Sequence, residues 1–288
     1  MKKEKIVLGM SGGVDSSVAA LLLKEKGYDV HAIFMKNWDD KHAICNSEDD
    51  FADASSVCKA LDIKLKKINY TKEYKNRVFN KFIQDHVEGF TPNPDVLCNR
   101  EIKFDVFRNY AKEIGADKIA SGHYARVVKQ NNSYFIKKAK DKNKDQSYFL
   151  YQLDGEIIKN LELPLGEINK DDVRKIAEEN SLATFEKKDS TGICFIGERK
   201  YNDFVGQFFK SKKGKIISVD GENIGIHNGH MYFTVGQRKG LGIGAKNSAF
   251  DKPWYVFKKD IEKNIVYVAQ GSEHPALFSD ELIADNMF

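Results

Sequence analysis

The sequence predicts an α/β protein in which a doubly wound parallel sheet precedes a smaller, β-rich domain. Through roughly the first 120 residues, short apolar runs alternate with segments of helical spacing, an order typical of parallel strands linked by helices. After Gly197 the pattern changes to short strands separated by glycine, which indicates a separate β-rich unit. A chain of 288 residues with 41% hydrophobic residues is long enough to bury both cores.

The first strand is the apolar run Ile6-Val7-Leu8, which is too short for a helix and typical of a buried strand. A glycine turn follows, and then a helix is predicted because Val18, Leu21 and Leu22 fall at i, i+3 and i+4. Gly27 stands where such a helix would end. Further strands are predicted at residues 30–35, 63–68 and 118–121, and further helices at 52–61, 72–86 and 102–114.

The second half of the chain begins with a predicted β-hairpin over residues 126–138, because Asn131-Asn132 separates two strand-like runs. A helix is predicted at Lys170 to Glu179. The later strands are predicted at residues 215–219, 231–235, 254–257 and 265–269.

The turn after the first strand has the composition of an anion-binding site. Residues 9–17 read Gly-Met-Ser-Gly-Gly-Val-Asp-Ser-Ser. Gly12 and Gly13 let the backbone approach a ligand closely, and free N–H groups at a helix N-terminus attract phosphate. The hydroxyls of Ser11, Ser16 and Ser17 can donate hydrogen bonds to phosphate oxygens. The alternative is a tight, well-capped turn, since many such turns bind nothing.

Two familiar phosphate loops do not fit this turn, because it lacks both the Walker A lysine and the three-glycine dinucleotide fingerprint. It resembles instead the pyrophosphatase loop Ser-Gly-Gly-x-Asp-Ser of the enzymes that release AMP and pyrophosphate from ATP. The loop is complete here over Ser11 to Ser16. Ligands of a doubly wound sheet bind at the carboxyl ends of its strands, so Ser11, Met35 and Gly122 are expected along one edge.

Composition limits the class of protein further. A net charge of +4 is compatible with a nucleic-acid partner but does not by itself indicate one. The apolar runs are too short to span a bilayer, and no secretory segment precedes the first strand, so a cytoplasmic protein without a membrane partner is expected. The four cysteines have no metal-ligand spacing, so no metal site is predicted from them.

Cys98 is predicted to lie at the start of a helix, after an approach stiffened by Pro92 and Pro94. A helix N-terminus stabilises a thiolate, so the pKa of Cys98 is expected to be lowered. Cys194 lies between Gly192 and Gly197, which favours a loop that can bend. When each cysteine is judged from its own stretch of sequence alone, the alternative is an inert side chain, because free cysteines are commonly buried.

Both cysteine stretches resemble motifs of the bacterial tRNA-specific 2-thiouridylase family. Residues 121–125, 144–150 and 236–242 do so as well, and the resemblance runs in order from residue 5 to about 285. In that family, AMP transfer turns the C2 oxygen of the wobble uridine into a good leaving group, and sulfur replaces it. The resemblance implies an ATP-dependent tRNA sulfurtransferase with ATP and Mg²⁺ as cofactors and tRNA as substrate. A cysteine desulfurase or a sulfur-relay protein would donate the sulfur.

The family's functional residues carry over by motif. Cys194 matches the persulfide-bearing cysteine, and Cys98 matches the second catalytic cysteine, which would leave a transient Cys98–Cys194 disulfide for a reductant to reopen. Asp95 matches a catalytic position that could hydrogen-bond the uracil edge or relay a proton. The implied ATP-binding positions are Gly9, Met10, Ser11, Gly12, Gly13, Val14, Asp15, Ser16, Met35 and Gly122. The implied tRNA-binding positions are Asn93, Pro94, Asp95, His123, Lys144, Asp145 and Gln146.

The expected domains are a pyrophosphatase-loop catalytic domain at 1–198, a small β-rich central domain at 199–272, and at 273–288 the start of a C-terminal β-barrel that is otherwise missing. Two other hypotheses remain. One is a different loop-sharing enzyme, such as an NAD or GMP synthetase, in which the cysteine motifs would be idle. The other is a non-enzymatic tRNA- or nucleotide-binding remnant that lacks its third domain. Sulfur transfer to tRNA separates the three.

Overall fold

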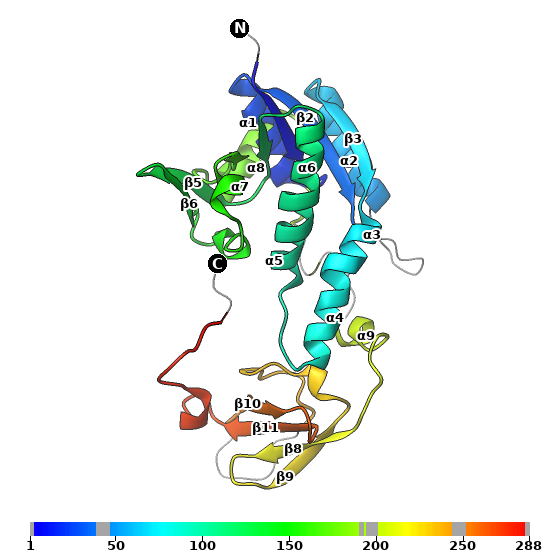
Figure 1. Ribbon diagram of the computed structural model, residues 1–288, viewed down its shortest axis with the longest axis vertical. Helices are drawn as coiled ribbons and strands as arrows, with labels where there is room; N and C mark the ends of the chain where they lie inside the picture. Colours follow the sequence, from blue (N-terminus) through cyan, green and yellow to red (C-terminus); the bar gives the residue numbers. More distant parts are fainter. Residues whose placement is uncertain (1–2, 39–46, 190–192, 194–200, 244–251, 286–288) are drawn as a thin grey trace. The chain divides into compact units, whose positions relative to one another are not determined.

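The computed structural model describes residues 3–38, 47–189, 193, 201–243 and 252–285 of the chain. The chain divides into two compact units, and Figure 1 labels many of their helices and strands. Unit 1 is formed by Met1–Phe79 and Pro94–Glu198, and unit 2 by Asn80–Asn93 and Arg199–Phe288. Within the described ranges, no helix has the length and apolar character needed to cross a membrane.

A five-stranded sheet of order β3-β2-β1-β4-β7, parallel at every pairing, forms the centre of unit 1. Its strands are β1 (Lys5–Gly9), β2 (Asp29–Lys36), β3 (Lys64–Asn69), β4 (Lys118–Ala120) and β7 (Leu161–Glu162). The chain runs outward from β1 to β3 and then returns to β4 on the other side of β1. This order confirms the predicted doubly wound sheet and makes the carboxyl ends of β1 and β4 its topological switch point.

Helices cover both faces of this sheet, because alternate residues of β1 point in opposite directions. Ile6 and Leu8 enter a core that includes residues of α1 (Val14–Glu25), α2 (Ser47–Ala60) and α8 (Lys170–Glu179). Val7 enters a second core on the opposite face. That core includes residues of the π-helical segment η2 (Asn99–Val106), α6 (Phe107–Glu113), α7 (Gly155–Ile158) and the hairpin of β5 (Ala125–Gln130) and β6 (Ser133–Lys138).

Two helical stretches are longer than predicted. The first comprises α3 (Thr71–Tyr74), the π-helical η1 (Lys75–Phe79) and α4 (Asn80–Val87), and the division between the two units falls within it. The second begins with α5 (Pro94–Cys98) and continues through η2 and α6. It starts at Pro94 because proline is well tolerated in the first turn of a helix. Cys98 therefore lies inside a helical stretch, and its predicted place at a helix start is wrong.

The predicted hairpin is confirmed. Asn131 and Asn132 both have positive φ, 48° and 64°, as the two central residues of a type I′ turn require. Asparagine tolerates this conformation better than most residues, which is why the pair marked the turn in the sequence. The short helix η3 (Ser147–Phe149) follows the hairpin and its connecting loop.

Unit 2 is built on a four-stranded sheet of order β10-β11-β8-β9. Its strands are β8 (Gly214–Ser218), β9 (Asn223–His227), β10 (Trp254–Asp260) and β11 (Ile265–Gln270), and the short helix α9 (Tyr201–Val205) precedes them. Residues 80–93 belong to unit 2, and His86 of α4 shows the reason. Its ring stacks on Phe209 at 5.8 Å, and its Nε2 hydrogen-bonds the Tyr201 hydroxyl. This sheet confirms the smaller β-rich unit.

The strand predicted at residues 231–235 is wrong, because a 3₁₀ turn, η4 (His230–Tyr232), occupies its start. The Phe233 amide donates to the His230 carbonyl at 3.1 Å, which closes this turn. Gly229 (φ 151°) and Gly236 (φ 87°) bracket the stretch in conformations that favour glycine. The turn buries Phe233 in the core, so packing overrides the strand preference of the sequence. A last 3₁₀ turn, η5 (Pro275–Leu277), follows β11.

Candidate functional site

The glycine turn connects β1 to α1 at the switch point of the sheet. The Met10 amide donates to the Ile33 carbonyl of β2 at 2.8 Å, which fixes the start of the turn. Gly13 is the N-cap of α1, and the helix begins at Val14. At Gly12, φ is 78° and an added Cβ would lie 2.1 Å from the Asp50 carbonyl oxygen. Gly12 is therefore required both by its conformation and by the closeness of α2.

The serines of the turn do not all face a ligand. Ser16 Oγ donates to the Gly13 carbonyl at 3.0 Å and lies 3.2 Å from Ser11 Oγ, so it braces the loop. Ser17 is fully buried, and its Oγ donates to the same carbonyl while accepting from Thr184. The expectation that the Ser17 hydroxyl reaches a phosphate is therefore wrong for this conformation. Ser11 is the exposed serine of the three.

The ends of β2 and β4 meet this turn as predicted for one sheet edge. A Cβ added at Gly122 would lie 3.0 Å from the Asp15 carbonyl carbon and from the Ser16 amide nitrogen, so the two backbones are in close contact. Met35 Cε lies 3.4 Å from the position of a Cβ on Gly9. The Tyr124 hydroxyl donates to Asp15 Oδ1 at 2.7 Å. The predicted ATP-binding residues of three strands are thus brought together.

Cys98 and Asp95 lie one helical turn apart in α5, and both are desolvated. Cys98 is 5% exposed, and burial raises the pKa of its thiol, with the Lys103 charge opposing that rise. Burial also raises the pKa of the Asp95 carboxyl. The expected lowering of the Cys98 pKa is wrong, because the residue is not at the free N–H groups of a helix end and burial dominates. Cys194 lies outside the described residues.

We expect alkylation of Cys98 by iodoacetamide in the free protein to remain slow until the pH exceeds the ordinary thiol range. The thiolate is the reactive form, and burial disfavours it. Peptide mass spectrometry across a pH series would measure this rate, with Cys58 as an internal control because burial raises its pKa to about 11. A Cys98 rate that rose at the same pH as that of free cysteine would contradict the prediction.

His123 is buried and neutral rather than presented to solvent. Its Nδ1 is 2.8 Å from Ser121 Oγ, and its ring centroid is 6.2 Å from that of Phe104 in η2. Burial lowers its pKa well below the ordinary value, and the charge of Lys103 adds to that effect. His123 therefore joins the end of β4 to the helical stretch that carries Cys98.

The segment Lys144-Asp145-Gln146 is held by hydrogen bonds. Asp145 accepts from the Ala139 amide and the Ser147 hydroxyl, both at 2.9 Å, so its carboxylate shapes the loop. Gln146 exchanges bonds with the backbone of Tyr124 in both directions, at 3.0 and 2.8 Å. Lys144 forms an ion pair with Asp189 at 2.5 Å. Pro94 is buried in α5, whereas Asn93 belongs to unit 2.

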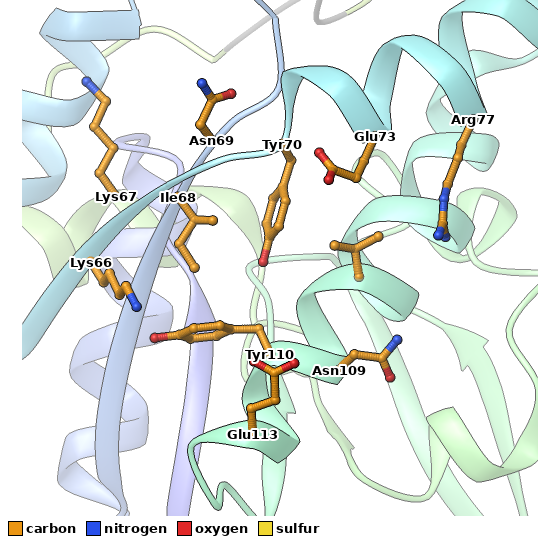
Figure 2. A pocket seen from close by; sticks show the side chains of 11 residues that line it. Lys66, Lys67, Ile68, Asn69, Tyr70, Glu73, Arg77, Asn109, Tyr110 and Glu113 are labelled. Atoms are coloured by element: carbon orange, nitrogen blue, oxygen red, sulfur yellow. The ribbon is translucent and has the colours of Figure 1, made fainter.

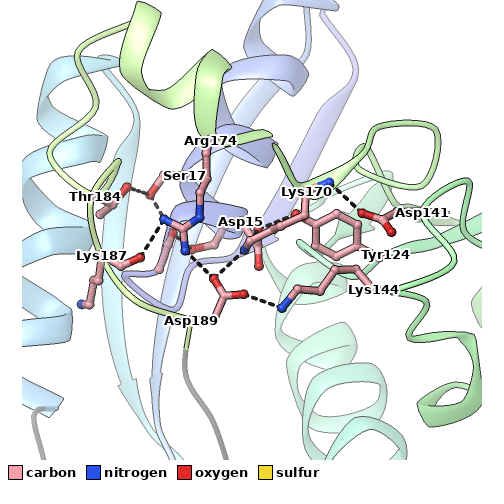
Figure 3. Close-up of polar contacts among 12 residues, drawn as sticks. Asp15, Ser17, Tyr124, Asp141, Lys144, Lys170, Arg174, Thr184, Lys187 and Asp189 are labelled. Carbon is pink, nitrogen blue, oxygen red and sulfur yellow. Dashed lines mark hydrogen bonds and ion pairs between the residues drawn. The ribbon is translucent and has the colours of Figure 1, made fainter. Parts of the chain in front are cut away.

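Three charged residues that the sequence analysis missed complete this edge (Figure 3). Lys170 lies 2.7 Å from both Asp15 Oδ1 and Asp189 Oδ1, and Arg174 donates to Asp189 at 2.9 Å. Burial would raise the pKa of the Asp189 carboxyl, but its bonds to Lys144 and Lys170 lower it to about 2, so Asp189 is charged at neutral pH. No local motif marks them, since the pairs join residues far apart in the sequence.

A separate cleft of about 490 Å³ lies beside the end of β3 (Figure 2). Its polar lining includes Tyr70, Arg77 and Glu113, together with Lys66, whose ammonium lies 4.7 Å from the centre of the Tyr110 ring. None of the predicted site residues lines this cleft. This cleft and the predicted site residues therefore do not coincide.

Two family models match successive parts of the chain. Residues 4–198 match the family model of the tRNA methyl transferase HUP domain, and residues 202–270 match that of the tRNA methyl transferase PRC-barrel domain. The chain is 53% identical over its whole length to 78% of the tRNA-specific 2-thiouridylase MnmA 1 of Geobacillus kaustophilus. It is 52% identical over its whole length to 77% of the tRNA-specific 2-thiouridylase MnmA of Stutzerimonas stutzeri.

Among solved structures, the similarity is more distant. A 4-thiouridine synthetase–RNA complex with bound ATP matches 71% of this chain and 49% of that one, at 17% identity and a TM-score of 0.44.

Proposed function

This chain belongs to the tRNA-specific 2-thiouridylase family, and on that premise we propose that it is an ATP-dependent tRNA-uridine 2-sulfurtransferase. The proposed reaction adenylates the C2 oxygen of the wobble uridine and replaces it with sulfur from a cysteine persulfide. Its partners are tRNA and a cysteine desulfurase or sulfur-relay protein, and its compartment is the cytoplasm, where these partners meet.

The observation that supports the proposal is that Gly122-His123, at the end of β4, lies between the phosphate loop and the helical stretch that carries Cys98 and Asp95. Gly122 contacts the backbone of Asp15 and Ser16 in the loop, and His123 follows it directly. The His123 ring packs near Phe104, on the same helical stretch as Asp95 and Cys98. ATP at the loop and the uracil base beside Asp95 would therefore be bound by neighbouring backbone segments of unit 1.

The loop suits ATP through its backbone and its one exposed serine. Gly12 and Gly13 leave room for phosphate oxygens, and the N-terminus of α1 offers N–H groups to them. Met35 and Gly122 would contact the adenosine. The carboxylate of Asp15 is a hard oxygen ligand of the kind that Mg²⁺ prefers, and its side chain is 31% exposed. Asp15 would thus hold Mg²⁺, which neutralises charge on the departing pyrophosphate.

Sulfur transfer would use the two cysteines in sequence. The uridine O2 attacks the α-phosphate, and pyrophosphate leaves. Cys194 carries a persulfide from the donor. The Cys98 thiolate then attacks the Cys194 sulfur, forming the Cys98–Cys194 disulfide and releasing the terminal sulfur as hydrosulfide. Hydrosulfide attacks C2, AMP leaves with the oxygen, and a thiol reductant restores both cysteines with two electrons.

Cys98 is buried and Asp95 is half-buried in this conformation, so the reaction requires that substrate binding uncover the Cys98 thiol. A carboxyl whose pKa is raised by burial is suited to carry a proton to or from the uracil edge. Asn93, Pro94, His123, Lys144, Asp145 and Gln146 are proposed to form the tRNA contact. Of these, Lys144 offers an accessible positive charge, while Asp145 and Gln146 shape its loop.

We expect an unmodified tRNA transcript to gain 2-thiouridine only when ATP, Mg²⁺, a cysteine desulfurase and cysteine are all present. Nucleoside mass spectrometry would detect the product, and AMP should appear in equal amount. Reactions without ATP or without the desulfurase are the controls. Tight tRNA binding with no sulfur transfer would indicate a binding protein instead. AMP release that did not depend on tRNA would indicate a different loop-sharing enzyme.

A further inference from the structure

One carboxylate joins the glycine turn to the loop that carries Lys144. Asp189 Oδ1 accepts from Lys170 Nζ at 2.7 Å and from Arg174 Nη2 at 2.9 Å, while its Oδ2 accepts from Lys144 Nζ at 2.5 Å (Figure 3). Three cations thus share a single acid. A change at any one of them alters the charge that the other two experience.

Lys170 connects this acid to the glycine turn. Its side chain is 9% exposed, and its ammonium contacts Asp15 Oδ1 and Asp189 Oδ1 at the same distance of 2.7 Å. A desolvated ammonium depends on such partners, because little water can solvate it. The two carboxylates therefore compete for one buried cation.

Arg174 keeps Asp189 in place. Its Nη1 also donates to the carbonyls of Phe185 and Lys187 at 3.0 and 3.1 Å, so the guanidinium anchors the backbone that leads to Asp189. The Asp189 carboxylate is held on this backbone when another group takes Lys144 away.

Lys144 is the most accessible of the three cations, with a side chain 40% exposed against 35% for Arg174 and 9% for Lys170. An RNA phosphate is a strong acceptor for a lysine ammonium and would compete with Asp189 for it. Asp141 accepts from the Lys170 amide at 2.9 Å, which fixes the Lys144 loop against the start of α8. Lys144 can therefore turn to RNA while the backbone of Lys170 stays in place.

We propose that Asp189 is a positioning residue that couples RNA binding at Lys144 to the release of Asp15 in the glycine turn. The proposal rests on the proposed function, since it takes tRNA as the ligand of Lys144 and Mg²⁺–ATP as the ligand of the turn. When a phosphate takes Lys144, Asp189 keeps only two cations and attracts Lys170 more strongly. The hold of Lys170 on Asp15 weakens, and the Asp15 carboxylate becomes available to Mg²⁺.

Coupling of this kind is reciprocal, so tRNA should tighten nucleotide binding and nucleotide should tighten tRNA binding. The test is calorimetric titration of the full chain with a non-hydrolysable ATP analogue and Mg²⁺, with and without an unmodified tRNA transcript. In the unsubstituted protein, tRNA is expected to lower the analogue Kd by roughly 5- to 150-fold, the usual range for allosteric coupling. In Asp189→Asn the two Kd values should be equal.

Lys144→Met provides a second, independent readout, because it removes the cation from Asp189 without RNA. This variant should bind the analogue in the absence of tRNA more tightly than the unsubstituted protein does. Lys142→Met is the matched control, since Lys142 is an exposed lysine of the same loop and should leave the coupling unchanged.

Unchanged coupling in Asp189→Asn, or weaker analogue binding in Lys144→Met, would overturn the inference. If the unsubstituted protein binds the analogue equally well with and without bound tRNA, the inference fails and the proposed function stands. If that protein binds no analogue at all, the proposed function fails as well.

Discussion

Replacing Cys98 by serine is expected to abolish 2-thiouridine formation while Cys194 still accepts sulfur from the donor. Cys98 is proposed to break the Cys194 persulfide, and a serine hydroxyl is a far weaker nucleophile than a thiolate. Cys194→Ser should instead prevent persulfide loading altogether. Peptide mass spectrometry after exposure to a cysteine desulfurase and cysteine would locate the sulfur, and nucleoside analysis of tRNA would measure the product.

Cys58→Ser is the matched control for these variants. Cys58 of α2 is 1% exposed in the core that α1 and α2 share, so a serine there should lower stability by about 1–3 kcal/mol and leave sulfur transfer intact. If Cys194→Ser still carried the extra sulfur, on Cys98, the assigned roles would be reversed. Normal thiolation by both variants would exclude the proposed cysteine mechanism.

Gly12→Ala is expected to weaken binding of an ATP analogue by at least roughly tenfold, which corresponds to 1.4 kcal/mol. A non-glycine residue at positive φ costs about 1–2 kcal/mol, and the added Cβ would also lie 2.1 Å from the Asp50 carbonyl oxygen. Both obstacles are in the backbone, so the turn has to change shape to relieve them. Isothermal titration of the purified variant would measure the loss.

Gly27→Ala is the control that carries the positive-φ cost without a clash of the added Cβ. Gly27 also has positive φ, 87°, but nothing lies within 4 Å of an added Cβ, and the residue follows the far end of α1. This variant should lose about 1–2 kcal/mol of stability in thermal or denaturant unfolding and bind the analogue normally. Equal binding by Gly12→Ala and the unsubstituted protein would show that the turn is not the nucleotide site.

The features that the sequence predicted correctly are those set by local patterns. The Ile6-Val7-Leu8 strand, the glycine turn and the α1 helix follow from side-chain periodicity and from the conformational freedom of glycine, which act over a few residues. The Asn131-Asn132 turn is the same kind of signal. Regular alternation of such strands and helices was sufficient to predict the parallel sheet and the edge at which Met35 and Gly122 meet the turn.

The sequence by itself thus determined the fold class, the phosphate loop and the two cysteines that carry the proposed chemistry. Only the tertiary structure decided the environment of those groups. It buried Cys98 and partly buried Asp95 and so raised both pKa values, where the local pattern had predicted a lowered thiol pKa. It also brought Lys170 to Asp15 across 155 positions of the sequence. Burial and charge pairing depend on segments that meet only when the chain folds, so no local spacing encodes them.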